Sequence, residues 1–166
     1  MSERSKIAMY LRNLVFGIED SLVSTVGLLA GLAAAGAPRE TLILTGIVLI
    51  SVEALSMAAG SFLSEESAKE YESKHAISYR YALAGACIMF ASYIVAGLFP
   101  LLPYLILSGT EALAASVMLS LILLGALGTY HGKIADVSAV RSAFRMVLIG
   151  GAAIALGVFI GQLFGV

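Results

Sequence analysis

Five apolar segments, each long enough to cross a bilayer, make up most of this chain. They are approximately residues 12–35, 41–64, 76–99, 104–129 and 143–164. A transmembrane helix needs about 20 mostly apolar residues to cross a hydrocarbon core of about 30 Å. With 60% hydrophobic and only 13% charged residues, a soluble domain of 166 residues would be unable to bury so much apolar surface. The sequence therefore predicts an all-α integral membrane protein with five transmembrane helices.

The connections between these segments are short. They consist of a turn at 36–38, a charged connection at 65–74, a turn containing Pro100 and Pro103, and a loop at 130–142. None leaves room for a separate soluble domain, so we expect a single transmembrane domain over residues 1–166. The first segment is too long for a signal-peptide core and should remain in the mature protein.

Lysine and arginine are concentrated on one side of the predicted membrane. If the N-terminus is cytosolic, nine of the ten lie on the cytosolic side and only Arg39 lies outside. Cytosolic loops of membrane proteins carry such an excess. We therefore expect a cytosolic N-terminus and, with five spans, a C-terminus on the opposite side. The net charge of −1 gives no indication of a nucleic-acid partner.

Glycines recur at a spacing of four residues in several segments: Gly27 and Gly31, Gly128 and Gly132, and Gly157, Gly161 and Gly165. Small residues at this spacing let membrane helices approach closely. Because five helices form a thin bundle, we expect some of these faces to contact a second copy of the chain. The sequence thus predicts a homodimer in the lipid bilayer.

Two carboxylates and one thioether lie at a depth where polar groups are costly. Asp20 is eight residues beyond Arg12, and Met57 is eight residues before Glu65, so each lies about 12 Å into its helix. Glu53 lies one turn deeper than Met57 on the same face. A charged carboxylate there costs roughly 2.5 to 3.5 kcal/mol, and no Lys or Arg lies at matching depth in any segment. Carboxylates with a thioether favour a transition metal such as Fe²⁺ or Mn²⁺, so Asp20, Met57 and Glu53 are the predicted metal ligands.

Two alternatives explain these acids differently. Protonated acids, hydrogen-bonded to hydroxyls of Ser24, Thr25, Thr45 or Ser51, would hold neighbouring helices together in a membrane interaction module that transports nothing. In the second alternative, the protein is a passive divalent-cation channel, and a pH gradient does not change the rate at which metal crosses.

Glu19 and Glu111 are secondary candidates. Glu19 lies about 100° around the helix from Asp20, so it would face a dimer interface or the headgroups. Glu111 lies about 10 Å from the outer end of the fourth segment, a position suited to ion exit or proton handling.

Glu65 and Glu66 are further secondary candidates in a cytosolic connection that also holds His75. They would gather cations at the mouth of the path. Glu65 also precedes Lys69 by four residues, which favours a solvated, salt-bridged extension of the second helix.

Enzyme motifs are missing from the sequence, including a phosphate-binding loop, HExxH and GxSxG. The single cysteine, Cys87, excludes a disulfide within one chain and is expected to be buried. We expect neither catalysis nor a permanently bound cofactor.

Two motifs carry a family resemblance. The first segment contains FGIEDSLVST, and the second contains SMAAGSFLSEES. They resemble FGxxDGLVST and SMxxGxYLSxxS of the vacuolar iron transporter family, which includes the yeast vacuolar iron and manganese carrier and the plant nodulin-21-like proteins. The family's metal-path aspartate falls on Asp20, and its pore methionine falls on Met57. The last segment, RMVLIGGAAIALGVFIG, also resembles the family's fifth helix.

The resemblance implies five helices, a cytosolic N-terminus and a homodimer with the metal path between the two first helices. It also implies export of Fe²⁺, and often Mn²⁺, from the cytosol with protons as the counter-ion. The host would be the cell membrane in a prokaryote or a vacuolar-type membrane in a eukaryote.

The chain departs from the family pattern in three places. Ser21 replaces the glycine after the aspartate, and Leu49 stands where the iron transporters carry an acid, two turns before the methionine. The long cytosolic metal-binding domain between the second and third helices is replaced by the connection 65–74. The chain therefore resembles a short form of the family.

Overall fold

The computed structural model describes residues 3–73 and 79–165, which form five helices and no strand. The helices are α1 (Glu3–Ala34), α2 (Arg39–Ser73), α3 (Tyr79–Ile106), α4 (Gly109–Ile134) and α5 (Ala139–Phe164). Each contains a stretch long and apolar enough to cross a membrane. The prediction of an all-α integral membrane protein with five spanning helices is confirmed.

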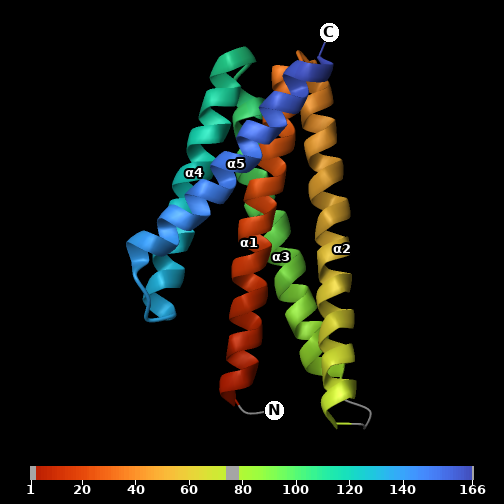
Figure 1. Cartoon of the computed structure of the whole chain (residues 1–166). Coiled ribbons are helices and arrows are strands. Elements are labelled where there is room, and N and C mark those ends of the chain that lie inside the picture. Colours follow the sequence, from red (N-terminus) through yellow and green to blue (C-terminus); the bar gives the residue numbers. More distant parts are fainter. Residues whose placement is uncertain (1–2, 74–78, 166) are drawn as a thin grey trace.

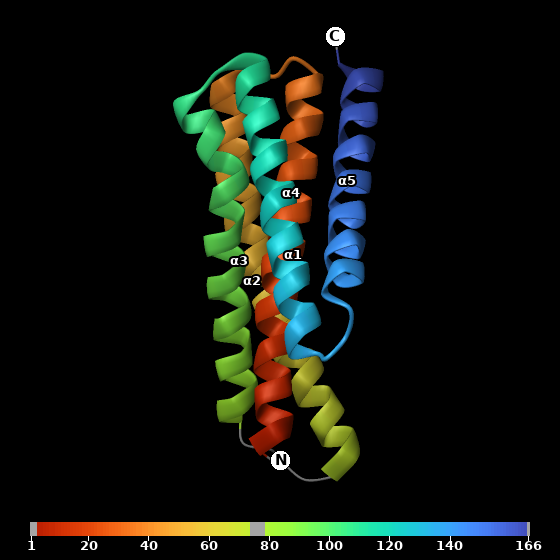
Figure 2. The ribbon, with the colours of Figure 1, turned by 90° about the vertical axis from the view of Figure 1, so that its left-hand side faces the viewer.

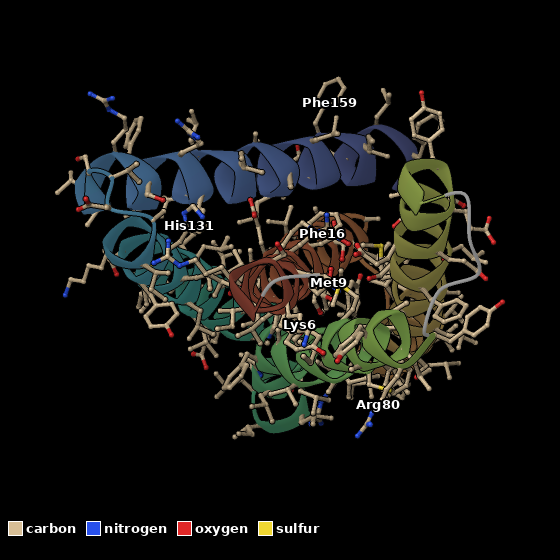
Figure 3. All side chains as sticks on the ribbon, turned by 90° about the horizontal axis from the view of Figure 1, so that it is seen from below. Lys6, Met9, Phe16, Arg80, His131 and Phe159 are labelled. Atoms are coloured by element: carbon tan, nitrogen blue, oxygen red, sulfur yellow. The ribbon has the colours of Figure 1, made fainter. Side chains whose placement is uncertain are left out.

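Helix α1 lies in the middle of the bundle. Seen from below, the other four helices surround it (Figure 3), and it contacts each of them. Its largest interfaces are with α3 and α5, whereas its interface with α2 is small. The N-terminus and the C-terminus lie at opposite ends of the bundle (Figure 1), and the end of α4 and the start of α5 lie towards the N-terminal end (Figure 2).

Glycines hold α5 closely against both α1 and α4. A β-carbon at Gly31 would lie 2.7 Å from the carbonyl oxygen of Gly157, and one at Gly132 would lie 2.6 Å from the Cα atom of Ala139. The predicted packing role of the repeated glycines is confirmed. Their partners are helices of the same chain, however, so these faces are already occupied without a second copy.

Helix α3 continues through Pro100 and Pro103, where the sequence predicts a turn. Each proline lacks an N–H and leaves a carbonyl group one turn earlier without its usual partner. An unwound backbone at membrane depth would leave still more polar groups unsatisfied, so the helix persists. The hydroxyl of Ser116 on α4 adds a hydrogen bond to the Pro100 carbonyl oxygen, at 2.7 Å.

Arg39 caps the C-terminal end of α3. Its Nε atom donates a hydrogen bond to the carbonyl oxygen of Tyr104 at 2.7 Å, and its Nη2 atom donates to that of Leu105 at 2.6 Å. The last carbonyl groups of a helix have no partner within the helix. The one arginine predicted to lie outside therefore has a structural role there.

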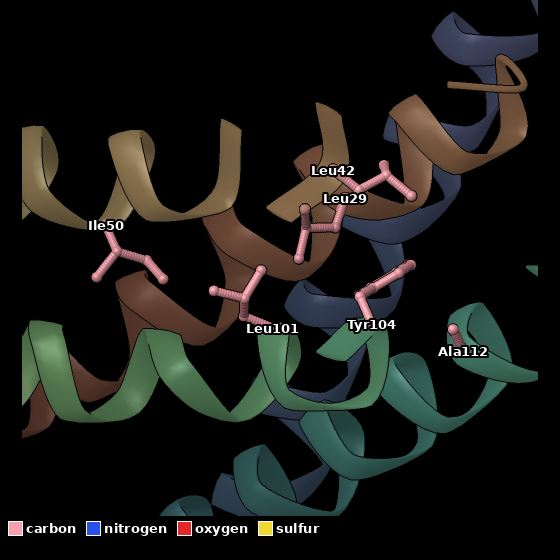
Figure 4. Close-up of a cluster of buried hydrophobic side chains, with 6 residues drawn as sticks. All are labelled: Leu29, Leu42, Ile50, Leu101, Tyr104 and Ala112. Carbon is pink, nitrogen blue, oxygen red and sulfur yellow. The ribbon is translucent and has the colours of Figure 1, made fainter. Parts of the chain in front are cut away.

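Buried apolar side chains form two clusters in the bundle. One cluster joins four helices (Figure 4) and consists of Leu29, Leu42, Ile50, Leu101, Tyr104 and Ala112. A second cluster packs α1 against α3, α4 and α5 and contains Val15, Leu22, Ala96, Leu124 and Met146. Cys87, predicted to be buried, is exposed on α3, because apolar side chains of a membrane protein can face lipid as well as the core.

Candidate metal site

An ion pair marks the register of α1 against α2. Nη2 of Arg12 lies 3.2 Å from Oε2 of Glu65, and the two helices run in opposite directions (Figure 1). Asp20 and Met57 are each eight residues from this pair, or about 12 Å along their helices. This register places Asp20 and Met57 at one level, with Glu53 one turn deeper.

The two acids lie near each other on neighbouring helices. Asp20 and Glu53 are both partly buried, and their charges are close enough to interact. Within residues 3–73 and 79–165, neither carboxylate has a hydrogen bond or an ion pair. Two like charges repel strongly in an apolar setting, and a divalent cation between them would remove that repulsion.

Tyr93 of α3 lies beside Ser24, one turn from Asp20 on α1, and no sequence pattern singles it out. Its side chain is fully buried, and its hydroxyl oxygen lies 2.8 Å from Oγ of Ser24. A tyrosine within an apolar segment forms no pattern that sequence could reveal. The one available signal was that a buried tyrosine hydroxyl needs a hydrogen-bond partner.

Gly17 and Ser21, both in the first motif, bring α1 against α3 at this level. A β-carbon at Gly17 would collide with the hydroxyl of Ser92 and lie 3.1 Å from the carbonyl oxygen of Met89. Ser21, which replaces the family's glycine, donates a hydrogen bond to the carbonyl oxygen of Tyr93 at 2.7 Å. The motif therefore sets the position of α1, and with it that of the neighbouring acid.

Of the four hydroxyls that might have bound protonated acids, those of Ser24 and Ser51 are engaged elsewhere. Ser24 pairs with Tyr93, and Ser51 donates to the carbonyl oxygen of Ile47 in its own helix at 2.8 Å. The buried Oγ1 atom of Thr25 has no hydrogen-bond partner in the part of the chain that the structure describes. None of these contacts supports the interpretation of the acids as structural hydrogen-bonding groups.

Glu19 lies on a different side of α1. Its charge interacts with that of Asp20 and also with His131 on α4. His131 in turn has Nδ1 3.3 Å from Oγ of Ser142 on α5, and Figure 3 places it at the α4–α5 end of the bundle. Glu19 is therefore near α4 of its own chain, and its contact with a dimer interface or with the headgroups stays a prediction.

Glu111 is exposed in the first turn of α4. The predicted depth of about 10 Å is wrong, because α3 extends to Ile106 and α4 begins only at Gly109. A carboxylate at a helix N-terminus is favoured by the helix dipole.

Glu65 and Glu66 lie on α2, which continues as a helix to Ser73. The predicted helical extension is therefore confirmed. Glu65 pairs with Arg12, and Glu66 is partly buried. The side chain of Lys69 and the whole of His75 lie outside the described residues.

Few strong metal ligands gather at any one point. Among the described residues, no three His, Cys, Asp or Glu side chains come together as a metal cluster. Besides the two carboxylates, the donors at this level are the Met57 thioether and the hydroxyls of Ser24 and Tyr93.

The sequence is similar to known proteins over most of its length. The profile of the VIT family matches residues 11–82 and 75–162. Vacuolar iron transporter homolog 3 of Arabidopsis thaliana is 32% identical over 164 residues, covering 89% of this chain and 78% of that protein. Homolog 1 of the same plant is 30% identical with the same coverage, and homolog 5 of Oryza sativa subsp. japonica is 28% identical over 172 residues, covering 95% and 81%. The chain therefore belongs to the VIT family.

Proposed function

We propose that this protein carries a divalent transition metal, Fe²⁺ or Mn²⁺, out of the cytosol in exchange for protons. The observation that carries the proposal is the approach of Asp20 and Glu53 on different helices, with no counter-charge from the described residues. The names of the relatives, vacuolar iron transporter homologs, support iron as cargo and a vacuolar-type membrane as one host. The metal is a substrate here, and the proposal requires neither an enzymatic step nor a bound cofactor.

Asp20 and Met57 form the first ion site in this proposal, and Glu53 passes metal or protons deeper. A carboxylate that releases a cation can take up a proton in its place, which makes exchange chemically natural. The thioether is a soft ligand and favours a transition metal over Mg²⁺ or Ca²⁺.

Loading from the N-terminal end is supported by the packing beyond Glu53. Ile50 lies one turn further along α2, and it is buried with Leu29 and Leu101 in the cluster of Figure 4. These side chains close the space between α1, α2 and α3 on the outer side. With the N-terminus in the cytosol, as the positive charges favour, the cytosol is the side from which an ion enters.

A second copy of the chain completes the path in this proposal. Asp20 and Glu53 are only partly buried, and a carboxylate facing lipid is costly. A groove of about 510 Å³ runs along α1 and α5 from Val23 and Ser24 to Phe164. A homodimer that covers this side of α1 would remove the acids from lipid and give each copy the same contacts.

Purified protein in liposomes tests the proposal. A metal-quenched dye inside the vesicles and a pH dye outside would follow the two ions together, for wild type and for Asp20→Asn. We expect Fe²⁺ or Mn²⁺ to move, protons to move in the opposite direction, and Asp20→Asn to lose transport by more than about 100-fold, since even outer-shell changes at metal sites cost 10- to 100-fold. Asp20→Asn should still insert and assemble as wild type does.

Each alternative has its own outcome in the same experiment. Equal transport by Asp20→Asn would remove this residue from the path. Metal flux that ignores the pH gradient would indicate a passive channel. Absence of flux, with lower bundle stability in the acid variants, would indicate a membrane interaction module.

A further inference from the structure

The hydroxyls of Ser24 and Tyr93 lie at the level of Glu53. Ser24 is twelve residues beyond Arg12, and Glu53 is twelve residues before Glu65, so the ion pair between Arg12 and Glu65 sets them at the same height. Ser24 also follows Asp20 by four residues and shares its helix face. An ion moving from Asp20 towards Glu53 therefore meets this hydroxyl pair.

An ion at that height needs more than one carboxylate. Octahedral coordination by oxygen is typical of Mn²⁺ and similar cations, and apolar side chains occupy the next turn beyond Glu53. The oxygen atom of a hydroxyl has two lone pairs, so it can replace a water ligand without adding charge. The two hydroxyls are the neutral oxygen donors that this level offers.

The bond between Ser24 and Tyr93 is not needed to hold the helices together. Ser21 already joins α1 to α3 through the Tyr93 carbonyl oxygen at 2.7 Å, three residues from Ser24. Either oxygen of the Ser24–Tyr93 pair can be the donor at 2.8 Å. The pair can therefore open and turn both oxygens towards a cation while the backbone contact persists.

We propose that Ser24 and Tyr93 complete a second ion site with Glu53, in which their two neutral oxygens replace water on a partly dehydrated divalent cation. This site rests on the proposed function and adds its deeper step. Tyr93 is then a residue that sets the rate of passage, whereas Asp20 and Met57 set the affinity of entry.

Initial rates of Fe²⁺ and Mn²⁺ uptake into liposomes, over a range of metal concentrations, test this site. The variants are Tyr93→Phe, Ser24→Ala and the double variant, compared with Tyr104→Phe. Tyr104 is the matched control because it is equally buried on α3 but lies eleven residues further along, about 16 Å away.

We expect Tyr93→Phe and Ser24→Ala each to lower the maximal rate by about threefold to tenfold, the range of one lost hydrogen bond or ligand. The apparent KM for metal entry should change by less than about twofold, since the entry site is intact. The double variant should be no slower than Tyr93→Phe, because the two hydroxyls act together. Tyr104→Phe should transport as wild type does.

Three outcomes would overturn the second ion site. Tyr93→Phe and Ser24→Ala could both transport at the wild-type rate, or their rates could fall only in proportion to the folded protein measured by gel filtration. If Tyr104→Phe lowered the transport rate as much as Tyr93→Phe does, the loss would be an effect of packing. If Tyr93→Phe does not fold, the transport rate of Ser24→Ala, which is the smaller change, decides whether the second ion site exists. Failure of the proposed function itself is recognised separately, because wild type would then move no metal.

Discussion

Helix α1 has two closely packed sides that differ in chemistry. Against α3 it is joined by hydroxyl groups, with Ser21 and Ser24 bound to Tyr93 at 2.7 and 2.8 Å. Against α5 it is joined by apolar contacts and by a close backbone approach, where Gly31 meets Gly157 without any side chain between them. Among the described residues, these two hydroxyl bonds of α1 thus run to α3, next to the turn that carries Asp20. The difference separates positions that should affect ion movement from those that should affect folding.

The largest expected effect on folding comes from adding a side chain at the glycine contact between α1 and α5. Gly157→Leu would place a side chain against the carbonyl group of Gly27 and push α5 away from α1. Overpacking of this kind costs about 1–3 kcal/mol or more, and with the backbone as obstacle we expect little or no folded protein. Fluorescence-detected size-exclusion chromatography would measure the amount of folded protein.

Gly151→Leu is the control for that variant. Gly151 is on the same helix, and a β-carbon there would meet nothing within 4 Å. It should yield a folded protein in wild-type amount. If both variants behaved alike, close packing of α5 on α1 would not be required for folding.

An intermediate effect is expected on the polar side. Glu53→Gln keeps the shape of the side chain but removes its charge, so metal transport in liposomes should fall by about 10- to 100-fold, as for other losses at metal sites. Thermal stability should stay the same or rise, because the cost of a carboxylate in the membrane is removed. If Glu53→Gln lowered thermal stability but kept metal transport, Glu53 would be a residue required for folding and not for ion movement, which contradicts this distinction.

The smallest effect is expected at the ion pair that marks the register. Arg12 is 61% exposed and Glu65 is 15% exposed, and exposed pairs typically contribute about 0–1 kcal/mol. Arg12→Ala should therefore lower thermal stability only slightly, and less at high salt. A double-mutant cycle with Glu65→Ala would isolate the pair. A coupling well above 1 kcal/mol would mean that the pair is more than a marker of register.

The number of helices and the level of the acids could be predicted from the sequence. Hydropathy gives the spans because a membrane helix must be apolar over its whole length. The level of Asp20 and Met57 follows from counting residues from Arg12 and Glu65, and those two charges do meet. The glycine contacts were also predictable, apart from the identity of their partners.

Other features depend on tertiary contacts that a single sequence does not contain. Helix α3 persists through Pro100, where Ser116, sixteen residues away, adds a hydrogen bond to the carbonyl oxygen, and the start of α4 only at Gly109 changes the position of Glu111. The position of Tyr93 beside Ser24 depends on the packing of α3 between α1 and α2. Neither the contact of Ser116 with Pro100 nor the position of Tyr93 produces a periodic pattern in the sequence.

The glycine contact between α1 and α5 also restricts how the bundle can move. Where one backbone lies directly on another, there is no side chain whose rotamer could change to make room, so a shift of α5 against α1 would have to move the backbone itself. Helix α2 has only a small interface with α1, and it carries Glu53 and Met57. A tilt of α2 would therefore disturb few contacts with α1, and most of its cost would come from the large interface of α2 with α3.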